Sequence, residues 1–217
     1  FPPRSLFMLV APQDPQAPKG RLILPQVQVI RDILDHGGLV SMAGFSDLDA
    51  QMESLSRRPD VVIVDAQVFA RVVKIIPEDW PVTAFSIIMG RAKGDLELMA
   101  EGARSISRLK PGSKILIAEA CTHHSMVNDI AREQIPRLLE ERVGGLRFEV
   151  MAGNDFPSNV ASYDLIISCG GCMITRGHYL ARLKKALEAG VPMTNFGLTL
   201  SYLSGQMERA IAPFNSR

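Results

Sequence analysis

The sequence predicts an α/β fold of two tandem small α/β domains, each with a mainly parallel sheet flanked by helices. Short apolar runs of strand length alternate along the chain with segments in which apolar residues recur at helical spacing. The strand-like runs are nearly all apolar, as expected for parallel strands that are covered on both faces. Pro111 and Gly112 interrupt this alternation near the middle of the chain, and the same pattern then begins again.

In the first half, Pro25 suits the first turn of a helix, and Val27, Ile30 and Ile33 then repeat at helical spacing up to Gly37. The strands predicted here are 6–10, 39–43, 61–64 and 82–89, and the helices are 25–37, 46–55, 67–76 and 95–109. These elements make up a first domain, residues 1–110.

In the second half, Leu180, Leu183 and Leu187 share one face of a helix that Gly190 terminates. The strands predicted here are 114–118, 146–150, 163–168 and 191–196, and the helices are 130–143, 178–189 and 200–212. These elements make up a second domain, residues 111–217, of about the common domain size.

The composition argues against nucleic-acid-binding and membrane-spanning proteins. The apolar fraction of 47% allows a real core, and a net charge of +1 provides no electrostatic footprint for nucleic acid or anionic lipid. No apolar run approaches the ~20 residues that span a bilayer. The chain begins Phe-Pro-Pro-Arg without an initiator Met, so we expect it to be part of a longer protein. Neither nucleic acid nor a membrane is an expected partner.

Motifs for nucleotide binding and hydrolysis are missing from the sequence. It contains no Gly-x-x-x-x-Gly-Lys-Ser/Thr phosphate loop, no Gly-x-Gly-x-x-Gly, no Gly-x-Ser-x-Gly and no His-Glu-x-x-His. We therefore assign no catalytic residue, and we expect this chain not to be an enzyme as given.

The three cysteines are the chemically distinctive residues. An odd number argues against a disulfide framework, and so few thiols suit a reducing, cytoplasmic setting. Cys121 follows one predicted strand, and Cys169 and Cys172 follow another. Ligand sites in open α/β sheets lie at the carboxyl ends of the strands. If these two strands are neighbours, the three thiols and the imidazoles of His123 and His124 converge at one edge.

Four interpretations of this set remain open. Three thiolates can hold an iron–sulfur cluster, and three thiolates with an imidazole can hold a structural zinc ion. Cys169 and Cys172 alone form a Cys-x-x-Cys pair, which would suit a thiol–disulfide oxidoreductase. Finally, the cysteines could be no more than small buried side chains.

At these residues the sequence resembles the FeFe-hydrogenase maturation GTPase family, HydF. The cluster motif of that family is Cys-x-His, a long spacer and His-Cys-x-x-Cys. Here it corresponds to Cys121-Thr-His123 and to Cys169-Gly-Gly-Cys172, with Ser168 in place of the second His. The resemblance extends over most of the chain, and further matching stretches are 17–26, 93–95, 119–124, 135–137 and 190–195.

The resemblance implies that this chain comprises a dimerisation domain and a cluster-binding domain, without the family's GTPase domain. It implies a 4Fe–4S cluster bound through Cys121, Cys169 and Cys172. It also implies a scaffold and metallochaperone that transiently holds the two-iron precursor of the hydrogenase active site. The implied partners are a second copy of the chain, the radical-SAM maturases and the apo FeFe-hydrogenase.

The fourth cluster ligand is the point at which the sequence departs from the family motif. A hydroxyl such as that of Ser168 is a far poorer iron ligand than an imidazole. His123 is the favoured fourth ligand and His124 a less favoured one; a carboxylate (Glu119 or Asp129) or an exogenous ligand are the alternatives. Four basic residues could contact a charged precursor, although solvated surface positions explain them equally well: Lys19, Arg21, Lys93 and Arg176.

Overall fold

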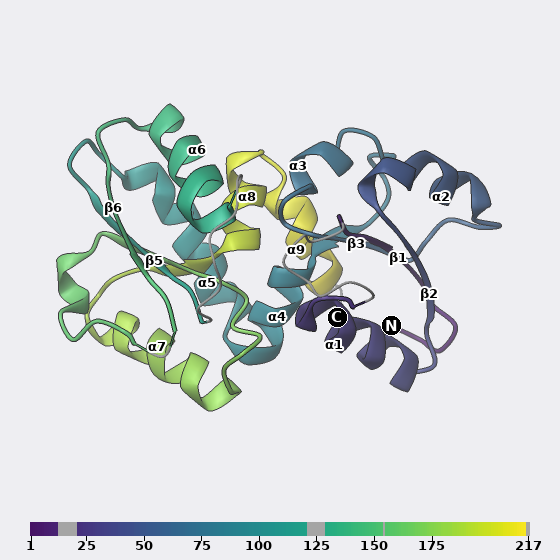
Figure 1. Cartoon of the computed structure of the whole chain (residues 1–217), viewed down its shortest axis with the longest axis horizontal. Helices are drawn as coiled ribbons and strands as arrows, with labels where there is room; N and C mark the ends of the chain where they lie inside the picture. The colour runs from purple at the N-terminus through teal and green to yellow at the C-terminus, as the bar shows by residue number, and fades with distance from the viewer. Residues whose placement is uncertain (13–20, 121–128, 154, 216–217) are drawn as a thin grey trace. The chain divides into compact units, whose positions relative to one another are not determined.

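Two four-stranded parallel sheets organise the chain, one in each of two units (Figure 1). A computed structural model describes residues 1–12, 21–120, 129–153 and 155–215 of the 217-residue chain. The first unit comprises Phe1–Ile88 and Gln206–Arg217, and the second comprises Met89–Gly205. Both sheets are flanked by helices, so the predicted fold class of two tandem α/β domains is confirmed.

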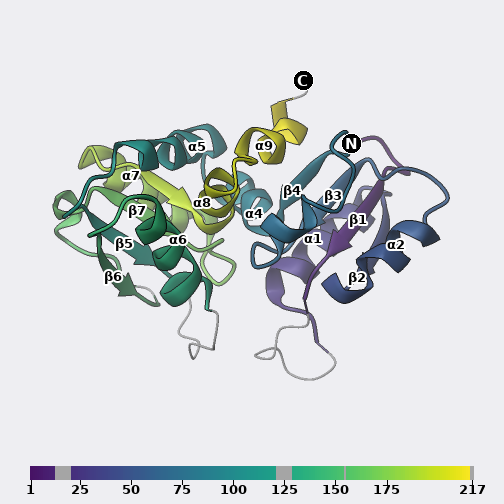
Figure 2. The same cartoon turned by 90° about the horizontal axis from the view of Figure 1, so that it is seen from above.

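The first sheet has the strand order β2-β1-β3-β4, and every pair is parallel. Figure 2 shows these four strands side by side in that order. In the register, Leu9 of β1 lies opposite Met42 of β2 and Ile63 of β3. The strands are β1 (Leu6–Val10), β2 (Leu39–Ala43), β3 (Val61–Val64) and β4 (Val82–Ala84).

Helices cover both faces of the first sheet, with α1 on one face and α2 and α3 on the other (Figure 1). Val29 and Ile33 of α1 are buried in one core cluster with Phe7 and Leu9 of β1. The helices are α1 (Leu24–Asp35), α2 (Leu48–Ser54), after the 3₁₀ turn Phe45–Asp47, α3 (Phe69–Val72) and α9 (Met207–Asn215).

The second sheet has the strand order β6-β5-β7-β8 and is also entirely parallel. The helices α6 and α7 lie on opposite faces of this sheet (Figure 1). Its strands are β5 (Lys114–Ala118), β6 (Arg147–Met151), β7 (Leu165–Ser168) and β8 (Met193–Asn195). Its helices are α5 (Leu96–Arg104), α6 (Ile135–Arg142), α7 (Arg176–Glu188) and α8 (Phe196–Leu203). Shorter turns of helix are Ser105–Arg108, Ile130–Gln134 and Val160–Ser162.

The division between the units lies at Ile88 and Met89, upstream of the boundary near residue 110 that the sequence predicted. The reason is α5, which packs against β8 and so belongs to the second sheet. A Cβ on Gly102 of α5 would lie 2.2 Å from the carbonyl oxygen of Met193, so the helix backbone lies directly against the strand.

The helix α9 belongs to the first unit, although it follows the whole of the second unit in sequence. It packs against β4, an edge strand of the first sheet. The Arg209 guanidinium of α9 donates to the carbonyl oxygens of Pro77 at 2.5 Å and Trp80 at 3.1 Å. The first unit is therefore built from two separate stretches of the chain.

Three element predictions are wrong in part. The helix predicted over 67–76 is limited to α3. The strand predicted over 82–89 ends at Ala84, and the chain enters helix α4 (Phe85–Lys93). The helix predicted over 200–212 is two helices, α8 and α9, because Gly205 adopts φ of +71° between them. Across the ranges that the structure describes, no helix has both the length and the apolar character needed to cross a bilayer.

Candidate functional site

The strands that precede the cysteines are neighbours in the second sheet. Ala118, the last residue of β5, lies opposite Ser168, the last residue of β7. The Cys169 N–H donates to the Ala118 carbonyl at 3.0 Å and continues the ladder by one residue. The carboxyl ends of both strands therefore meet at one edge of the sheet, as the convergence hypothesis requires. Cys121, His123 and His124 lie outside the described residues.

The Cys169 sulfur accepts two backbone hydrogen bonds. Ala120, which precedes Cys121 in the chain, donates its N–H at 3.1 Å, and Gly171 donates its N–H at 3.4 Å. Burial raises the pKa of the Cys169 thiol above its ordinary value, and these two N–H groups act in the opposite direction. Amide donors directed at sulfur are the interactions that stabilise a thiolate ligand of a metal.

The Cys-Gly-Gly-Cys loop packs tightly against Tyr179 of α7. Gly171 has φ of +64°, and a Cβ on it would lie 2.6 Å from the Tyr179 ring. Both the backbone conformation and the space therefore require glycine here. The loop leads into α7, whose first turn is capped by Thr175, with the Thr175 hydroxyl accepting the His178 N–H at 3.2 Å.

The ammonium group of Lys93 holds this loop through three backbone carbonyls. It donates to Gly171 at 2.6 Å, Ile174 at 2.7 Å and Cys172 at 3.3 Å. Burial lowers the pKa of Lys93, while the nearby thiols act to raise it. Burial likewise raises the pKa of Cys172, and the charge of Lys93 opposes that shift. Sequence reasoning named Lys93 only as one of four basic residues that could contact a precursor.

Ser168, which stands where the family motif has its second His, is buried and hydrogen-bonded to another side chain. It is 2% exposed, and its hydroxyl lies 2.6 Å from that of Tyr179, which is 1% exposed. The Ser168 hydroxyl therefore already has a hydrogen-bond partner. The sequence provided no signal for the pairing, since Tyr179 reads only as one more apolar position of a helix.

The two carboxylates considered as fourth ligands have other partners. Glu119 is 2% exposed, and its carboxylate lies 2.7 Å from the Arg132 guanidinium. The Asp129 carboxylate accepts the N–H groups of Ala131 and Arg132, each at 2.9 Å, at the start of the turn that leads into α6.

The described residues supply two of the predicted ligands, and both are free thiols, Cys169 and Cys172. Within the described ranges, no group of three or more His, Cys, Asp or Glu side chains is placed to hold a metal ion. The donor chemistry nevertheless suits an iron–sulfur cluster. Two thiols share one tight loop, one sulfur already accepts two N–H groups, and the loop is closed around a positive charge.

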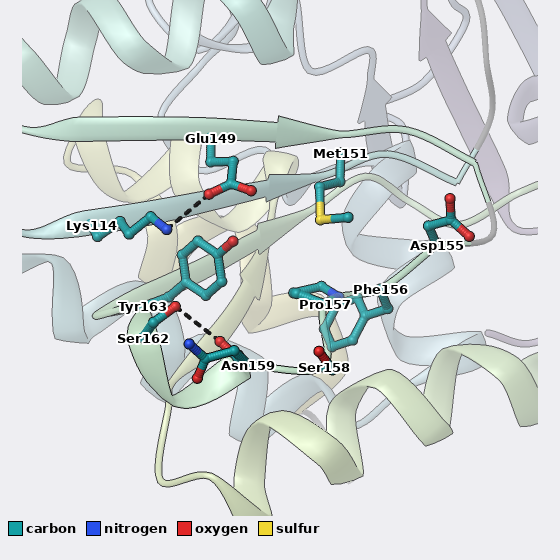
Figure 3. A pocket seen from close by; sticks show the side chains of 10 residues that line it. All are labelled: Lys114, Glu149, Met151, Asp155, Phe156, Pro157, Ser158, Asn159, Ser162 and Tyr163. Atoms are coloured by element: carbon teal, nitrogen blue, oxygen red, sulfur yellow. Dashed lines mark hydrogen bonds and ion pairs between the residues drawn. The ribbon is translucent and has the colours of Figure 1, made fainter.

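A separate cleft of about 570 Å³ lies elsewhere in the second unit (Figure 3). The Lys114 ammonium lies 2.9 Å from the Glu149 carboxylate and 4.4 Å from the centroid of the Tyr163 ring. The charges at this end of the cleft are therefore paired with each other. Its described lining includes neither Cys nor His, and the sulfur that it offers is the thioether of Met151.

Comparison with known proteins identifies the family. Residues 1–94 match the Hydrogen maturase F dimerization domain, and residues 97–213 match the Hydrogen maturase F tetramerization domain. Neither matched domain is a GTPase domain, and a search of curated proteins found no match. The resemblance seen in the sequence is confirmed, as is self-association. The chain belongs to the hydrogen maturase F family, HydF, acts in hydrogenase maturation, and carries the dimerization and tetramerization domains of that family.

Proposed function

We propose that this chain is a scaffold and carrier that binds a 4Fe–4S cluster through Cys121, Cys169 and Cys172. One observation carries the proposal: the Ala120 N–H donates to the Cys169 sulfur. This hydrogen bond brings the β5 end, one residue before Cys121, against the Cys-Gly-Gly-Cys loop. The residue that precedes Cys121 is thereby held beside Cys169, although 48 positions separate Cys121 from Cys169 in the sequence.

Three protein thiolates suit a carrier better than four would. A 4Fe–4S cluster held by three thiolates leaves one iron with a weak or exchangeable ligand. That iron can bind a group of the two-iron precursor and later release it to the apo-hydrogenase. His123 is the proposed exchangeable protein ligand, with His124 second. In this proposal the chain works in the cytoplasm, exchanges material with radical-SAM maturases and performs no catalysis itself.

The alternative of a thiol–disulfide oxidoreductase fits the site less well. A nucleophilic cysteine of that class has a pKa below its ordinary value. Burial instead raises the pKa of both Cys169 and Cys172. A Cys₃His zinc site uses the same atoms as the cluster, so only metal content and spectroscopy separate these two candidates.

Anaerobic reconstitution with iron and sulfide tests the proposal. We expect a broad absorption near ~400 nm that dithionite bleaches, as is typical of thiolate-bound iron–sulfur clusters. Changing Cys121, Cys169 or Cys172 to Ala should each strongly reduce iron retention without changing the oligomer. Ser168→Ala is the matched control, because it removes one heteroatom beside Cys169 and should retain iron. Colourless protein with one zinc, or a reversible two-electron dithiol couple, would favour the alternatives.

Pulsed EPR of the reduced cluster tests the fourth ligand. We expect a nitrogen coupling that disappears in His123→Ala and persists in the matched variant His124→Ala. An imidazole ligand must be unprotonated, so the coupling should weaken as the pH falls through ~6.5. The absence of any nitrogen coupling in the parent protein would mean an exogenous or oxygen ligand.

A further inference from the structure

Lys93 closes a ring of carbonyl groups around its ammonium. The three acceptors belong to Gly171, Cys172 and Ile174, at distances between 2.6 and 3.3 Å. An ammonium group has three N–H donors, so these three bonds use all of them. Lys93 is therefore not available to hold a charged precursor, which was one role considered from the sequence.

The backbone around Lys93 is held against the same ring that supports the cysteine loop. Gly94 follows Lys93, and a Cβ on it would lie 3.0 Å from the Tyr179 ring. A Cβ on Gly171 would lie 2.6 Å from that ring. The Tyr179 ring is thus closely packed against both the residue that follows α4 and the cysteine loop. This packing fixes the span that the Lys93 side chain bridges.

We propose that Lys93 is a positioning residue for the cluster, holding the Cys169–Cys172 loop in its ligating conformation and placing a fixed positive charge beside the thiolates. This inference rests on the proposed function of the site. The charge has a direct electrostatic consequence. Reduction adds one electron to an already anionic cluster, and a nearby cation stabilises the reduced state more than the oxidised one.

Arginine cannot reproduce the three carbonyl contacts of Lys93. A guanidinium directs its donors outward in a planar fork, whereas the three carbonyls here converge on a single nitrogen atom. Lys93→Arg therefore retains the charge and loses the geometry, while Lys93→Met loses both at nearly the same side-chain length. Comparing the two variants separates electrostatics from positioning.

The experiment compares the reconstituted parent chain with Lys93→Met, Lys93→Arg and Lys184→Met. Lys184 is the matched control because it is exposed on α7 and pairs with Glu188 rather than with the loop. We measure iron loss to a ferrous chelator and the midpoint potential of the cluster by EPR-monitored titration. Lys93→Met should lose iron at least about tenfold faster, as expected for a group that supports metal ligands, and should have a lower midpoint potential. Lys93→Arg should lose iron faster with a potential near that of the parent, and Lys184→Met should match the parent in both.

A second measurement needs no cluster. Hydrogen–deuterium exchange of the metal-free protein should be faster over residues 169–174 in Lys93→Met and unchanged in Lys184→Met. Parental exchange, iron loss and potential in Lys93→Met would overturn the role of Lys93. A parent chain that takes up no iron would instead contradict the proposed function, while the exchange data would still decide whether Lys93 positions the loop.

Discussion

The hydroxyl groups of Ser168 and Tyr179 lie 2.6 Å apart in the interior of the second unit. The Tyr179 hydroxyl also lies 3.9 Å from the sulfur of Met99, which it can reach as a weak donor. Burial raises the pKa of Tyr179 well above its ordinary value, so this hydroxyl stays protonated and can act as a donor. The pair joins the end of β7, one residue before Cys169, to the beginning of α7.

Removing one hydroxyl of this pair should destabilise the protein. Tyr179→Phe leaves the buried Ser168 hydroxyl without its partner, at a cost of about 1–2 kcal/mol in the free energy of unfolding. The double variant Ser168→Ala, Tyr179→Phe should lose less than the sum of the single variants, because both polar groups are then gone. Urea unfolding of the four proteins measures this. Strictly additive losses would mean that the two hydroxyls do not interact.

Alanine substitutions at two glycines with positive φ distinguish the cost of backbone strain from the cost of a steric clash. Gly190 has φ of +69° and no atom within 4 Å of a built Cβ, whereas a Cβ on Gly171, at φ of +64°, meets the Tyr179 ring. Gly190→Ala should cost about 1 kcal/mol from the backbone alone, and Gly171→Ala about 2–4 kcal/mol because overpacking is added. Chemical denaturation compares the two variants. Equal losses would show that the loop can move away from the ring.

The ion pair in the cleft should show in the titration of Glu149. The hydrogen bond from Lys114 lowers the pKa of this carboxyl, and a hydrogen bond with Tyr163 adds to the effect. Lys114→Met should therefore raise the Glu149 pKa toward its ordinary ~4.3. NMR titration of the side-chain carboxyl carbon measures the shift. Lys184→Met is the control and should leave the Glu149 pKa unchanged.

The ion pair of Lys114 and Glu149 also determines in which direction the stability of the protein changes with pH. Because the pKa of Glu149 is lower in the folded state, its contribution to stability is present above the unfolded pKa and is lost as the pH falls through the folded value. Lys114→Met should therefore weaken the loss of stability between neutral and acidic pH. A variant with the same acid sensitivity as the parent would contradict this assignment.

An exposed apolar stripe on α1 is the predicted surface for dimerization of the first unit. Leu24, Val27 and Leu34 are between 40% and 54% exposed and lie on one side of the helix. Residues 1–94 match a dimerization domain, so a second copy is the expected partner. Val27→Glu should weaken the dimer in light scattering across micromolar concentrations, because burying a carboxylate there is unfavourable.

Gln28→Glu is the matched control for this prediction, since it adds the same charge to the same helix beside the stripe. It should leave the dimer intact. A dimer that survives Val27→Glu would exclude the α1 stripe and favour edge-to-edge pairing through β2. That strand is at one edge of the first sheet and is largely half-exposed, whereas β4 at the other edge is buried.

Most strands were predictable because a short apolar run bounded by turn residues is too short for a typical helix and is usually a buried strand. The run 6–10 and the run 61–64 became β1 and β3 without change. The run 82–89 was mistaken for a strand because it is mostly apolar, and in the structure the burial of its second half also alternates. Phe85, Ile87 and Met89 are buried while Ser86 and Ile88 are half-buried, which imitates a strand although the backbone is helical.

Of the candidate site, the sequence could predict only the features that follow from the order of the strands in the sheet. The rule that ligands gather at the carboxyl ends of parallel strands led to the adjacency of β5 and β7. The contacts of Lys93 and Tyr179 with the cysteine loop leave no local pattern in the sequence. Lys93 lies 78 positions from Gly171, and nothing in α4 indicates which backbone its ammonium will meet.

The packing of α9 on β4 has a consequence for how the chain comes to be folded. Residues 89–205 form one continuous stretch, so the second unit can fold as soon as that stretch has been synthesised. The first unit cannot be completed at that point, because β4 still lacks the helix of residues 207–215. The first unit therefore begins earlier in the chain than the second unit, but it is completed later. A fragment ending near residue 94 would also lack this helix, and its β4 would remain uncovered on that side.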